Sequence, residues 1–274
     1  VLVFSGLGSS DPSPQFSYRV NNGKIEKLCW LNGEFGTLSE EYLYVVIEKI
    51  GFEKAIDEEN IPTPEIYQKK NSLNNRVSRA DAVINFLSEK YSFEKIIVYG
   101  HSEGAPVGAK LATINKKITY LGFWAGNALP DFYDFILENR VAYHKGMISD
   151  SAAQSRIDKN IEQFKEIVQD SLNTESKGYT NLRWWSYSEP PINNLLKIDI
   201  PLYVQVATKD ESAPIESSYL IPLEFARKGK TNLSYKVCVG CDHGFSITKE
   251  NGETERRWKE IFKDFIKWAE EIEP

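Results

Sequence analysis

The chain has 274 residues, of which 41% are hydrophobic and 12% aromatic. This length suits one α/β domain with an insertion, or at most two domains, around a sizeable core. A formal net charge of −6 without a basic cluster argues against nucleic acid and anionic membranes as partners.

No apolar stretch approaches the length of a membrane span, and no secretory signal is visible. We therefore expect a cytoplasmic location, with an exported form carrying residues upstream of Val1 as the alternative. Nothing in the sequence indicates the oligomeric state.

The three cysteines are an odd number and do not form a disulfide framework. Cys238 and Cys241 make a C-x-x-C pattern, but at the end of a predicted strand rather than at a helix start. We interpret this spacing as a coincidence without a redox or metal-binding role. We expect no cofactor and no metal.

Apolar runs separated by turn residues predict six core strands. They cover residues 1–4, 42–47, 95–99, 118–124, 202–207 and 234–239. Apolar residues at helical spacing predict the helices between and after them. The clearest stripes are Val77, Ala80, Ile84 and Leu87; Ile157, Ile161, Phe164 and Val168; and Trp258, Ile261, Phe262, Phe265, Trp268 and Ile272.

Strands that alternate with helices predict an α/β fold with a mostly parallel sheet of about six or more strands, covered by helices on both faces. Residues 130–197 do not follow this alternation, and their first long helix has Ser149, Asp150 or Ser151 as candidate caps. We predict that residues 1–129 and 198–274 form the core and that residues 130–197 form a helical lid inserted over the sheet.

The stretch around Ser102 is a strand, a tight turn and a helix start, with the sequence Gly-His-Ser-Glu-Gly at positions 100–104. This is the G-x-S-x-G pattern, in which a serine is presented on a strained strand-to-helix turn. The glycines allow strand and helix to approach closely, and Pro106 fits the first helical turn because its missing N–H costs nothing there. The pattern predicts that Ser102 is a nucleophile.

A serine nucleophile needs a base within hydrogen-bond reach, and histidine suits this task. The sequence has three histidines. The side chain of His101 should diverge from its neighbour Ser102, and His144 lies in the predicted insertion. His243 follows the last strand, at the same sheet edge as Ser102, and we predict that it is the base.

The histidine in turn needs a carboxylate to fix its tautomer. Asp210 follows the strand at 202–207 and lies at the carboxyl edge of the sheet, where α/β sites are built. Glu211 is its nearest rival, and Asp242 is too close to His243 in sequence to orient it easily. We predict Asp210 as the third member.

The order Ser102, Asp210, His243 with its strand-turn-helix context resembles the α/β-hydrolase superfamily, over nearly the whole chain. In having a glutamate, Glu103, directly after the nucleophile, the sequence resembles the esterase and serine-aminopeptidase-like branches of this superfamily. The resemblance implies an oxyanion hole formed by the backbone N–H groups of Leu7, in the loop after the first strand, and of Glu103. It also implies that the insertion is a lid.

These residues favour a serine hydrolase that cleaves a small-molecule carboxylic ester through an acyl-enzyme, with a peptidase or thioesterase as alternatives. A catalytically silent binding protein on the same fold is the non-enzyme alternative. Trp184 and Trp185 either pack within the insertion or line a substrate pocket. An aminopeptidase would need carboxylates for the substrate's ammonium group, but we interpret the acids of the insertion as solvated surface charges. These acids are Asp131, Asp134, Glu138 and Glu189.

Overall fold

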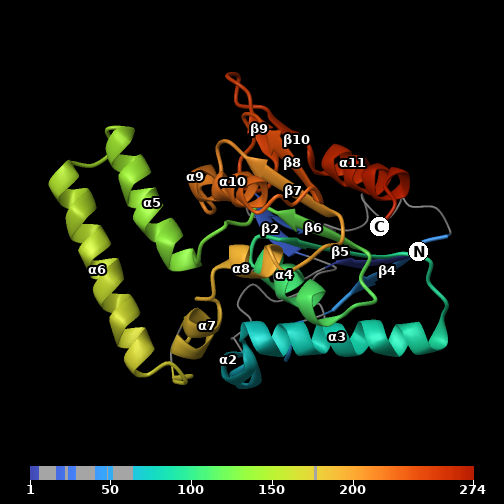
Figure 1. Ribbon diagram of the computed structural model, residues 1–274. Coiled ribbons are helices and arrows are strands. Elements are labelled where there is room, and N and C mark those ends of the chain that lie inside the picture. The colour runs from blue at the N-terminus through green and yellow to red at the C-terminus, as the bar shows by residue number, and fades with distance from the viewer. Residues whose placement is uncertain (6–16, 22–23, 29–40, 48, 52–63, 176–177) are drawn as a thin grey trace.

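The computed structural model describes residues 1–5, 17–21, 24–28, 41–47, 49–51, 64–175 and 178–274. Its centre is a six-stranded sheet with the strand order β4-β1-β5-β6-β7-β8 (Figure 1). Every neighbouring pair in this sheet is parallel. The strands are β4 (Leu43–Val46), β1 (Leu2–Ser5), β5 (Ile96–His101), β6 (Tyr120–Trp124), β7 (Leu202–Ala207) and β8 (Leu233–Cys238). The predicted α/β class, parallel arrangement and strand number are confirmed.

The central strands β6 and β7 are buried along their whole length. Their residues are almost continuously apolar because helices cover both faces of the sheet, as in other parallel sheets. The edge strand β8 is instead half-buried with exposed residues near its end. The strand predicted at 118–124 begins at Tyr120, and the hydroxyl group of the preceding Thr119 accepts a 2.9 Å hydrogen bond from the Ile96 amide.

Two apolar cores lie on the two faces of the sheet. One joins the sheet to five helices and contains Val77, Leu111 and Phe225. Four of these helices are α3 (Leu73–Lys90), α4 (Gly104–Ile114), α8 (Pro191–Leu195) and α10 (Leu220–Arg227). The other core joins the opposite face to α11 (Trp258–Glu271), whose predicted apolar stripe buries Phe262 and Phe265. Helices on both faces are thus confirmed.

The short helix α9 (Ile215–Ser218) contributes the buried Ile215 to the first core, whereas the short helix α2 (Glu65–Lys70) has no buried residue. Two antiparallel hairpins lie outside the main sheet. They pair β2 (Ser17–Asn21) with β3 (Lys24–Leu28), and β9 (Ser246–Thr248) with β10 (Thr254–Arg256). Within the described ranges, no helix is both long and apolar enough to cross a membrane.

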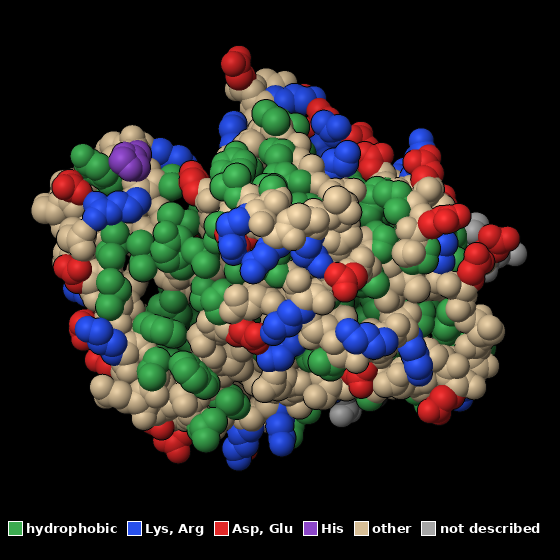
Figure 2. All heavy atoms as spheres, in the orientation of Figure 1, with side chains coloured by type: hydrophobic (Ala, Val, Ile, Leu, Met, Phe, Trp, Pro, Cys, Tyr) green, Lys and Arg blue, Asp and Glu red, His purple; other side chains and the backbone are tan. Residues whose placement is uncertain are grey.

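Between β6 and β7 the chain forms α5 (Asp131–His144), α6 (Asp150–Gln169) and α7 (Asn181–Ser186) before it reaches α8. Helices α5 and α6 pack against each other and lie beside the sheet, at the left of Figure 1. Of the three candidate caps for α6, Ser149 is the N-cap, and its Oγ accepts a hydrogen bond from the Ala152 amide. Hydrophobic side chains gather over these helices on the face seen in Figure 2. That the segment acts as a lid stays a prediction.

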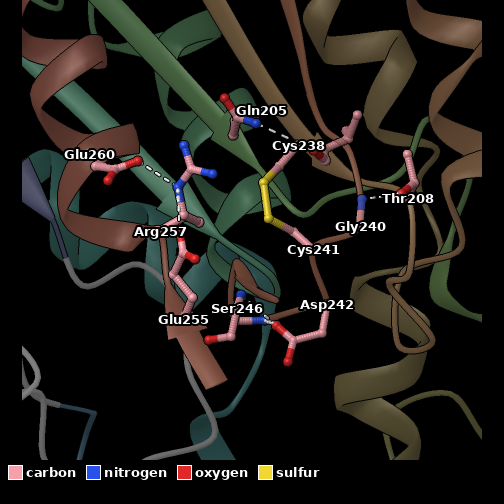
Figure 3. The surroundings of a disulfide bond; sticks show 12 residues. Gln205, Thr208, Cys238, Gly240, Cys241, Asp242, Ser246, Glu255, Arg257 and Glu260 are labelled. Carbon is pink, nitrogen blue, oxygen red and sulfur yellow. Dashed lines mark hydrogen bonds and ion pairs between the residues drawn. A yellow bond between two sulfur atoms is a disulfide. The ribbon is translucent and has the colours of Figure 1, made fainter. Parts of the chain in front are cut away.

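The interpretation of Cys238 and Cys241 as an incidental pair is corrected by the structure, in which a disulfide joins them (Figure 3). The turn after β8 brings their Cα atoms to 5.5 Å, a separation typical of disulfides. Gly240 has φ +81° within this turn, a conformation that glycine adopts without steric cost. The bonded turn packs on the loop after β7, because the Thr208 amide donates to the Cys238 carbonyl and the Lys209 amide to the Cys241 carbonyl.

The strand order also fixes where a ligand site should form. The chain moves from β1 outward to β4, then crosses back to β5 on the other side of β1. Such a reversal opens a crevice at the carboxyl ends of the two strands that flank it. Ser102 follows β5 directly and therefore lies at this point of the fold.

Candidate active site

Ser102 occupies a sharp turn between β5 and α4. Its φ is +56°, in the left-handed region that costs a non-glycine residue roughly 1–2 kcal/mol. The turn is held by a 2.9 Å hydrogen bond from the Ser102 amide to the Trp124 carbonyl of β6. A Cβ at Gly100 would lie 2.0 Å from the carbonyl oxygen of Gly104, so the turn requires glycine at that position. The strained backbone therefore projects the Ser102 side chain away from the sheet edge.

The structure brings His243 and Asp210 to this serine. The Oγ of Ser102 lies 2.9 Å from Nε2 of His243. Nδ1 of the same ring lies 2.8 Å from Oδ2 and 3.0 Å from Oδ1 of Asp210. With Nδ1 donating to the carboxylate, Nε2 is the acceptor for the serine hydroxyl. The three side chains thus form a continuous relay of hydrogen bonds.

The backbone of its own loop holds the Asp210 carboxylate in place. Its side chain is 1% exposed, and Oδ1 accepts hydrogen bonds from the amides of Ser212 and Ala213 at 2.9 and 2.8 Å. The loop after β7 therefore folds around the carboxylate and leaves it accessible to the ring of His243. The rival residue Glu211 points elsewhere and pairs with Lys145 at 3.1 Å. Asp242 accepts hydrogen bonds from the Gly244 and Ser246 amides of its own turn.

His101 has a role that sequence reasoning missed. Its Nε2 donates a 2.8 Å hydrogen bond to the backbone carbonyl of His243, and its ring lies between those of His243, Phe245 and Trp258. Burial, reinforced by the charge of His243, lowers the pKa of His101 to about 3. His101 is therefore neutral and holds the loop that carries His243. The position of His101 next to the nucleophile could have drawn attention to it. Its sequence separation from His243 gives no indication that the two residues meet.

The Glu103 backbone was expected to serve the oxyanion hole. Glu103 directly precedes α4 and is its N-cap residue, so its N–H belongs to the amides that a helix start leaves without intrahelical partners. The other expected donor, Leu7, lies outside the described residues. The amide of Glu103 is thus placed beside Ser102, at the positive end of a helix dipole.

The Glu103 side chain, which had no assigned role, is the centre of a buried ionic cluster. Oε2 lies 2.7 Å from Nη1 of Arg76 and 3.5 Å from Nζ of Lys49, and Oε1 lies 3.3 Å from Nε of Arg183. Burial favours a raised pKa for Glu103, but the charges of Arg76, Arg183 and Lys49 outweigh it and lower the pKa to about 2. Glu103 is therefore a carboxylate at any neutral pH.

Arg183 links this cluster to the insertion. Its Nη1 pairs with Oδ2 of Asp131 at 3.0 Å, and its side chain is 4% exposed. The guanidinium carbon lies 4.0 Å from the ring centroid of Tyr187 and 4.8 Å from those of Tyr179 and Trp184, within cation–π range. Helices α5 and α7 are therefore tied through one arginine to the residue next to Ser102.

The remaining residues singled out in the sequence lie in the insertion. Trp184 packs against Phe132 and Phe135 of α5, with ring centroids at 5.2 and 5.6 Å. Trp185 is 42% exposed. Glu189 pairs with Lys110 at 3.0 Å. The interpretation of the insertion's acids as solvated charges is wrong for one of them.

That acid is Asp134, which is 6% exposed. It was assigned to the surface because acidic residues are seldom buried without a pairing cation. In the part of the chain that the structure describes, no group of three or more histidine, cysteine or acidic residues is arranged to hold a metal ion.

The parallel sheet with its helices on both faces and the serine turn after β5 define the fold. The chain has the α/β-hydrolase fold. No family model matches the sequence, and no curated protein matches it.

Solved structures share this fold with the chain. A bromoperoxidase from Bacillus anthracis is similar with a TM-score of 0.54 and 13% identity, covering 98% of this chain and 91% of that one. A proline iminopeptidase from Mycobacterium smegmatis is similar with a TM-score of 0.52 and 13% identity, covering 97% and 89%. At such identities the likeness concerns the fold.

Proposed function

We propose that this protein is a serine hydrolase that cleaves carboxylic esters through an acyl-enzyme. The observation that carries the proposal is the relay from Ser102 to His243 to Asp210, with donor–acceptor distances of 2.9 and 2.8 Å. A binding protein on this fold would not require a strained serine, an accepting histidine nitrogen and a fixed carboxylate in one line.

In the first half-reaction, the Oγ of Ser102 attacks the ester carbonyl carbon as its proton passes to Nε2 of His243. Asp210 stabilises the imidazolium that forms and keeps Nδ1 protonated. The tetrahedral intermediate then collapses, and the protonated His243 gives its proton to the departing alcohol. The Ser102 oxygen keeps the acyl group as an ester.

The negative charge on the tetrahedral oxygen requires donors that are already in place. The backbone N–H of Glu103 meets this need in our proposal, together with that of Leu7. In the second half-reaction, water attacks the acyl carbon as His243 takes its proton. The second tetrahedral intermediate then collapses, the protonated His243 returns the proton to the departing Oγ of Ser102, and the acid is released.

Ser102→Ala tests the nucleophile. We expect this variant to fold as the wild type does, to escape labelling by a fluorophosphonate probe, and to lose at least about a thousandfold in kcat on p-nitrophenyl esters. Ser188→Ala, in the insertion, is the matched control and should retain both labelling and activity. A wild-type protein that neither reacts with the probe nor turns over any ester would favour the binding-protein alternative.

The preference for esters over amides is a separate prediction. An amine leaves poorly unless the protonated His243 delivers its proton accurately, so we expect p-nitrophenyl esters of short to medium acids to exceed aminoacyl anilides in kcat/KM. The similarity in fold to a proline iminopeptidase makes the peptidase the rival to test. If kcat/KM is larger for anilides than for esters, the protein is a peptidase and the assignment as an esterase is wrong.

A further inference from the structure

The disulfide lies where the ladder between β7 and β8 ends (Figure 3). Cys238, the last residue of β8, is paired with Ala207, the last residue of β7. The two chains stay together beyond this pair. The Thr208 amide donates to the Cys238 carbonyl at 3.2 Å, and the Gly240 amide donates to the Thr208 hydroxyl oxygen at 2.8 Å. The turn with the disulfide is therefore bonded to the start of the loop that carries Asp210.

One further hydrogen bond joins the loops of the two catalytic residues directly. The Lys209 amide donates to the Cys241 carbonyl at 2.8 Å. Lys209 immediately precedes Asp210, and Cys241 is two positions before His243. Because the sulfur bridge ties Cys241 to the end of β8, it fixes the acceptor of this hydrogen bond with respect to the sheet. The disulfide thus holds the chain that leads into His243 beside the chain that leads into Asp210.

The backbone on the other side of the His243 position is held without the disulfide. Oδ1 of Asp242 accepts hydrogen bonds from the Gly244 and Ser246 amides at 3.0 and 2.8 Å. The His101 ring donates to the His243 carbonyl at 2.8 Å. Cleavage of the disulfide therefore loosens one of two attachments of His243 and leaves the other in place.

The two sulfur atoms differ in their surroundings. Cys241 is 0% exposed and belongs to the apolar core that contains Trp124 and Phe245. Cys238 is half-buried, and the next residue, Val239, is 77% exposed. A thiolate from solution therefore reaches Cys238 from the surface of the turn, with Cys241 as the leaving group.

The closed loop is short, since Cys238 and Cys241 are three positions apart. A disulfide constrains the unfolded chain less when the loop that it closes is shorter. We therefore expect the protein to stay folded without this bond, and the effect of losing it to be local to the turn.

We propose that the Cys238–Cys241 disulfide positions His243 against Asp210, and that its reduction by a dithiol lowers the kcat of the hydrolase. This inference rests on the proposed function and adds a redox control to it. His243 must align with both Ser102 and Asp210, and small displacements of a catalytic group cost much of the rate. The disulfide is thus a positioning element and takes no part in the ester chemistry.

The exchange proceeds in two steps. A thiolate of the dithiol attacks Sγ of Cys238, the bond between the cysteines breaks, and Cys241 leaves as a thiolate that takes up a proton. The second thiolate of the dithiol then attacks the reductant's own sulfur in the mixed disulfide and releases Cys238, which is protonated in turn. Two electrons and two protons pass to the cysteines, and the dithiol becomes a cyclic disulfide.

The first experiment equilibrates the protein with mixtures of reduced and oxidised dithiothreitol, which are removed before the assay. A Cys29→Ser background, expected to respond as the wild type does, makes the thiol count report on the pair alone. As the count rises from none to two, kcat on a p-nitrophenyl ester should fall by about tenfold. KM should change by less than about twofold, because a misaligned base weakens the transition state rather than substrate binding. Reoxidation should restore kcat.

A double variant, Cys238→Ser with Cys241→Ala, reproduces the reduced state permanently. Alanine is chosen at position 241 because that side chain lies in the apolar core. We expect this variant to have the kcat of the reduced protein in every dithiothreitol mixture. Far-UV circular dichroism and thermal unfolding show whether it is folded.

Amide hydrogen exchange tests the positioning without any substrate. Reduction should accelerate exchange at the Thr208 and Lys209 amides, which donate to the carbonyls of the two cysteines. The Gly244 and Ser246 amides donate to the Asp242 side chain. Their exchange is the internal control and should not change.

The outcomes separate this proposal from the esterase. A thiol count that stays constant across the mixtures, or a kcat that does not follow the count, overturns the redox control and leaves the esterase standing. Loss of folded structure in the reduced protein would give the disulfide a general structural role and overturn the positioning. If no form hydrolyses an ester, the esterase is wrong, and the exchange rates at Thr208 and Lys209 still decide whether the disulfide holds the two loops together.

Discussion

At the scale of single residues, the site depends on two neighbours of Ser102 that do not react. His101 holds the backbone of the His243 loop through its Nε2, and the Glu103 carboxylate is drawn away from the serine by Arg76 and Arg183. One residue is buried neutral and the other buried charged. Each fixes one side of the serine turn, so the geometry of the nucleophile depends on both protonation states.

His101 makes stability depend on pH in a defined window. Its pKa is about 3 in the folded chain against about 6.5 when unfolded. As the pH falls below 6.5, the unfolded chain binds a proton that the folded chain refuses, so stability decreases. We expect His101 to account for a loss of about 2 kcal/mol between pH 8 and pH 5, seen in urea unfolding.

The matched variant is His101→Gln, which keeps a donor near Nε2 and does not titrate. The difference in stability between wild type and variant should therefore change by about 2 kcal/mol between pH 8 and pH 5, because groups that titrate in both proteins contribute equally to each. Glu103 does not interfere, because its pKa is lowered to about 2, and the stability linked to it is lost only as the pH falls below about 4.5. Parallel pH profiles for wild type and variant would contradict the role given to His101.

At the scale of elements, three helices meet at one arginine. Arg183 of α7 contacts Asp131 of α5 and the Glu103 carboxylate at the start of α4. The pair between Arg183 and Glu103 is almost completely buried, whereas Asp131 is 39% exposed, so removing a partner of Glu103 costs more than breaking a pair on the surface. The cluster thus couples the insertion to the serine turn by charge rather than by apolar packing.

Arg183→Met should lower the free energy of unfolding by about 1.5–3 kcal/mol, because Oε1 of the buried Glu103 loses its charged partner while Arg76 and Lys49 remain at Oε2. Arg140→Met is the control, since Arg140 pairs with Asp150 where both side chains are exposed, and its loss should be below about 1 kcal/mol. Urea unfolding of the two variants measures the difference. If both variants lose the same free energy of unfolding, the buried Arg183 cluster stabilises the protein no more than an exposed ion pair does.

At the scale of the whole molecule, helices α5 and α6 of the insertion pack against each other and lie beside the sheet (Figure 1). An aromatic cluster joins α5, α6 and α7 through Phe132, Phe164 and Trp184. The surface over these helices is rich in hydrophobic side chains (Figure 2). The aromatic residues are therefore used first for packing, and a contribution to the substrate pocket is a further prediction.

Trp184→Ala should destabilise the protein by about 3 kcal/mol, the cost of removing a large ring from a packed cluster. Trp185→Ala, at an exposed position, should cost less than about 1 kcal/mol. Thermal unfolding gives the first comparison, and the ratio of kcat/KM values for short and medium acyl esters gives the second. A change of that ratio in a variant that stays folded would place the ring in the pocket.

The sequence by itself determined the features that depend on local patterns. The apolar runs predicted the strands of the sheet, and helical spacing predicted the faces that α3 and α11 bury, because period and composition report directly on what each element covers. The turn at Ser102 was visible because glycine at position 100 is required wherever the chain bends this tightly. The positions of Asp210 and His243 followed from the rule that parallel strands end at one edge.

The tertiary structure decided what depends on segments far apart in the chain. The Glu103–Arg183 pair joins residues 80 positions apart, and the burial of Asp134 arises only when α5 packs beside the core. The Cys238–Cys241 bond depends on the path of a turn that the spacing does not specify. Burial lowers the pKa of His101, and the charges packed around Glu103 lower its pKa. Both are properties of the packed molecule, which no local pattern of residues encodes.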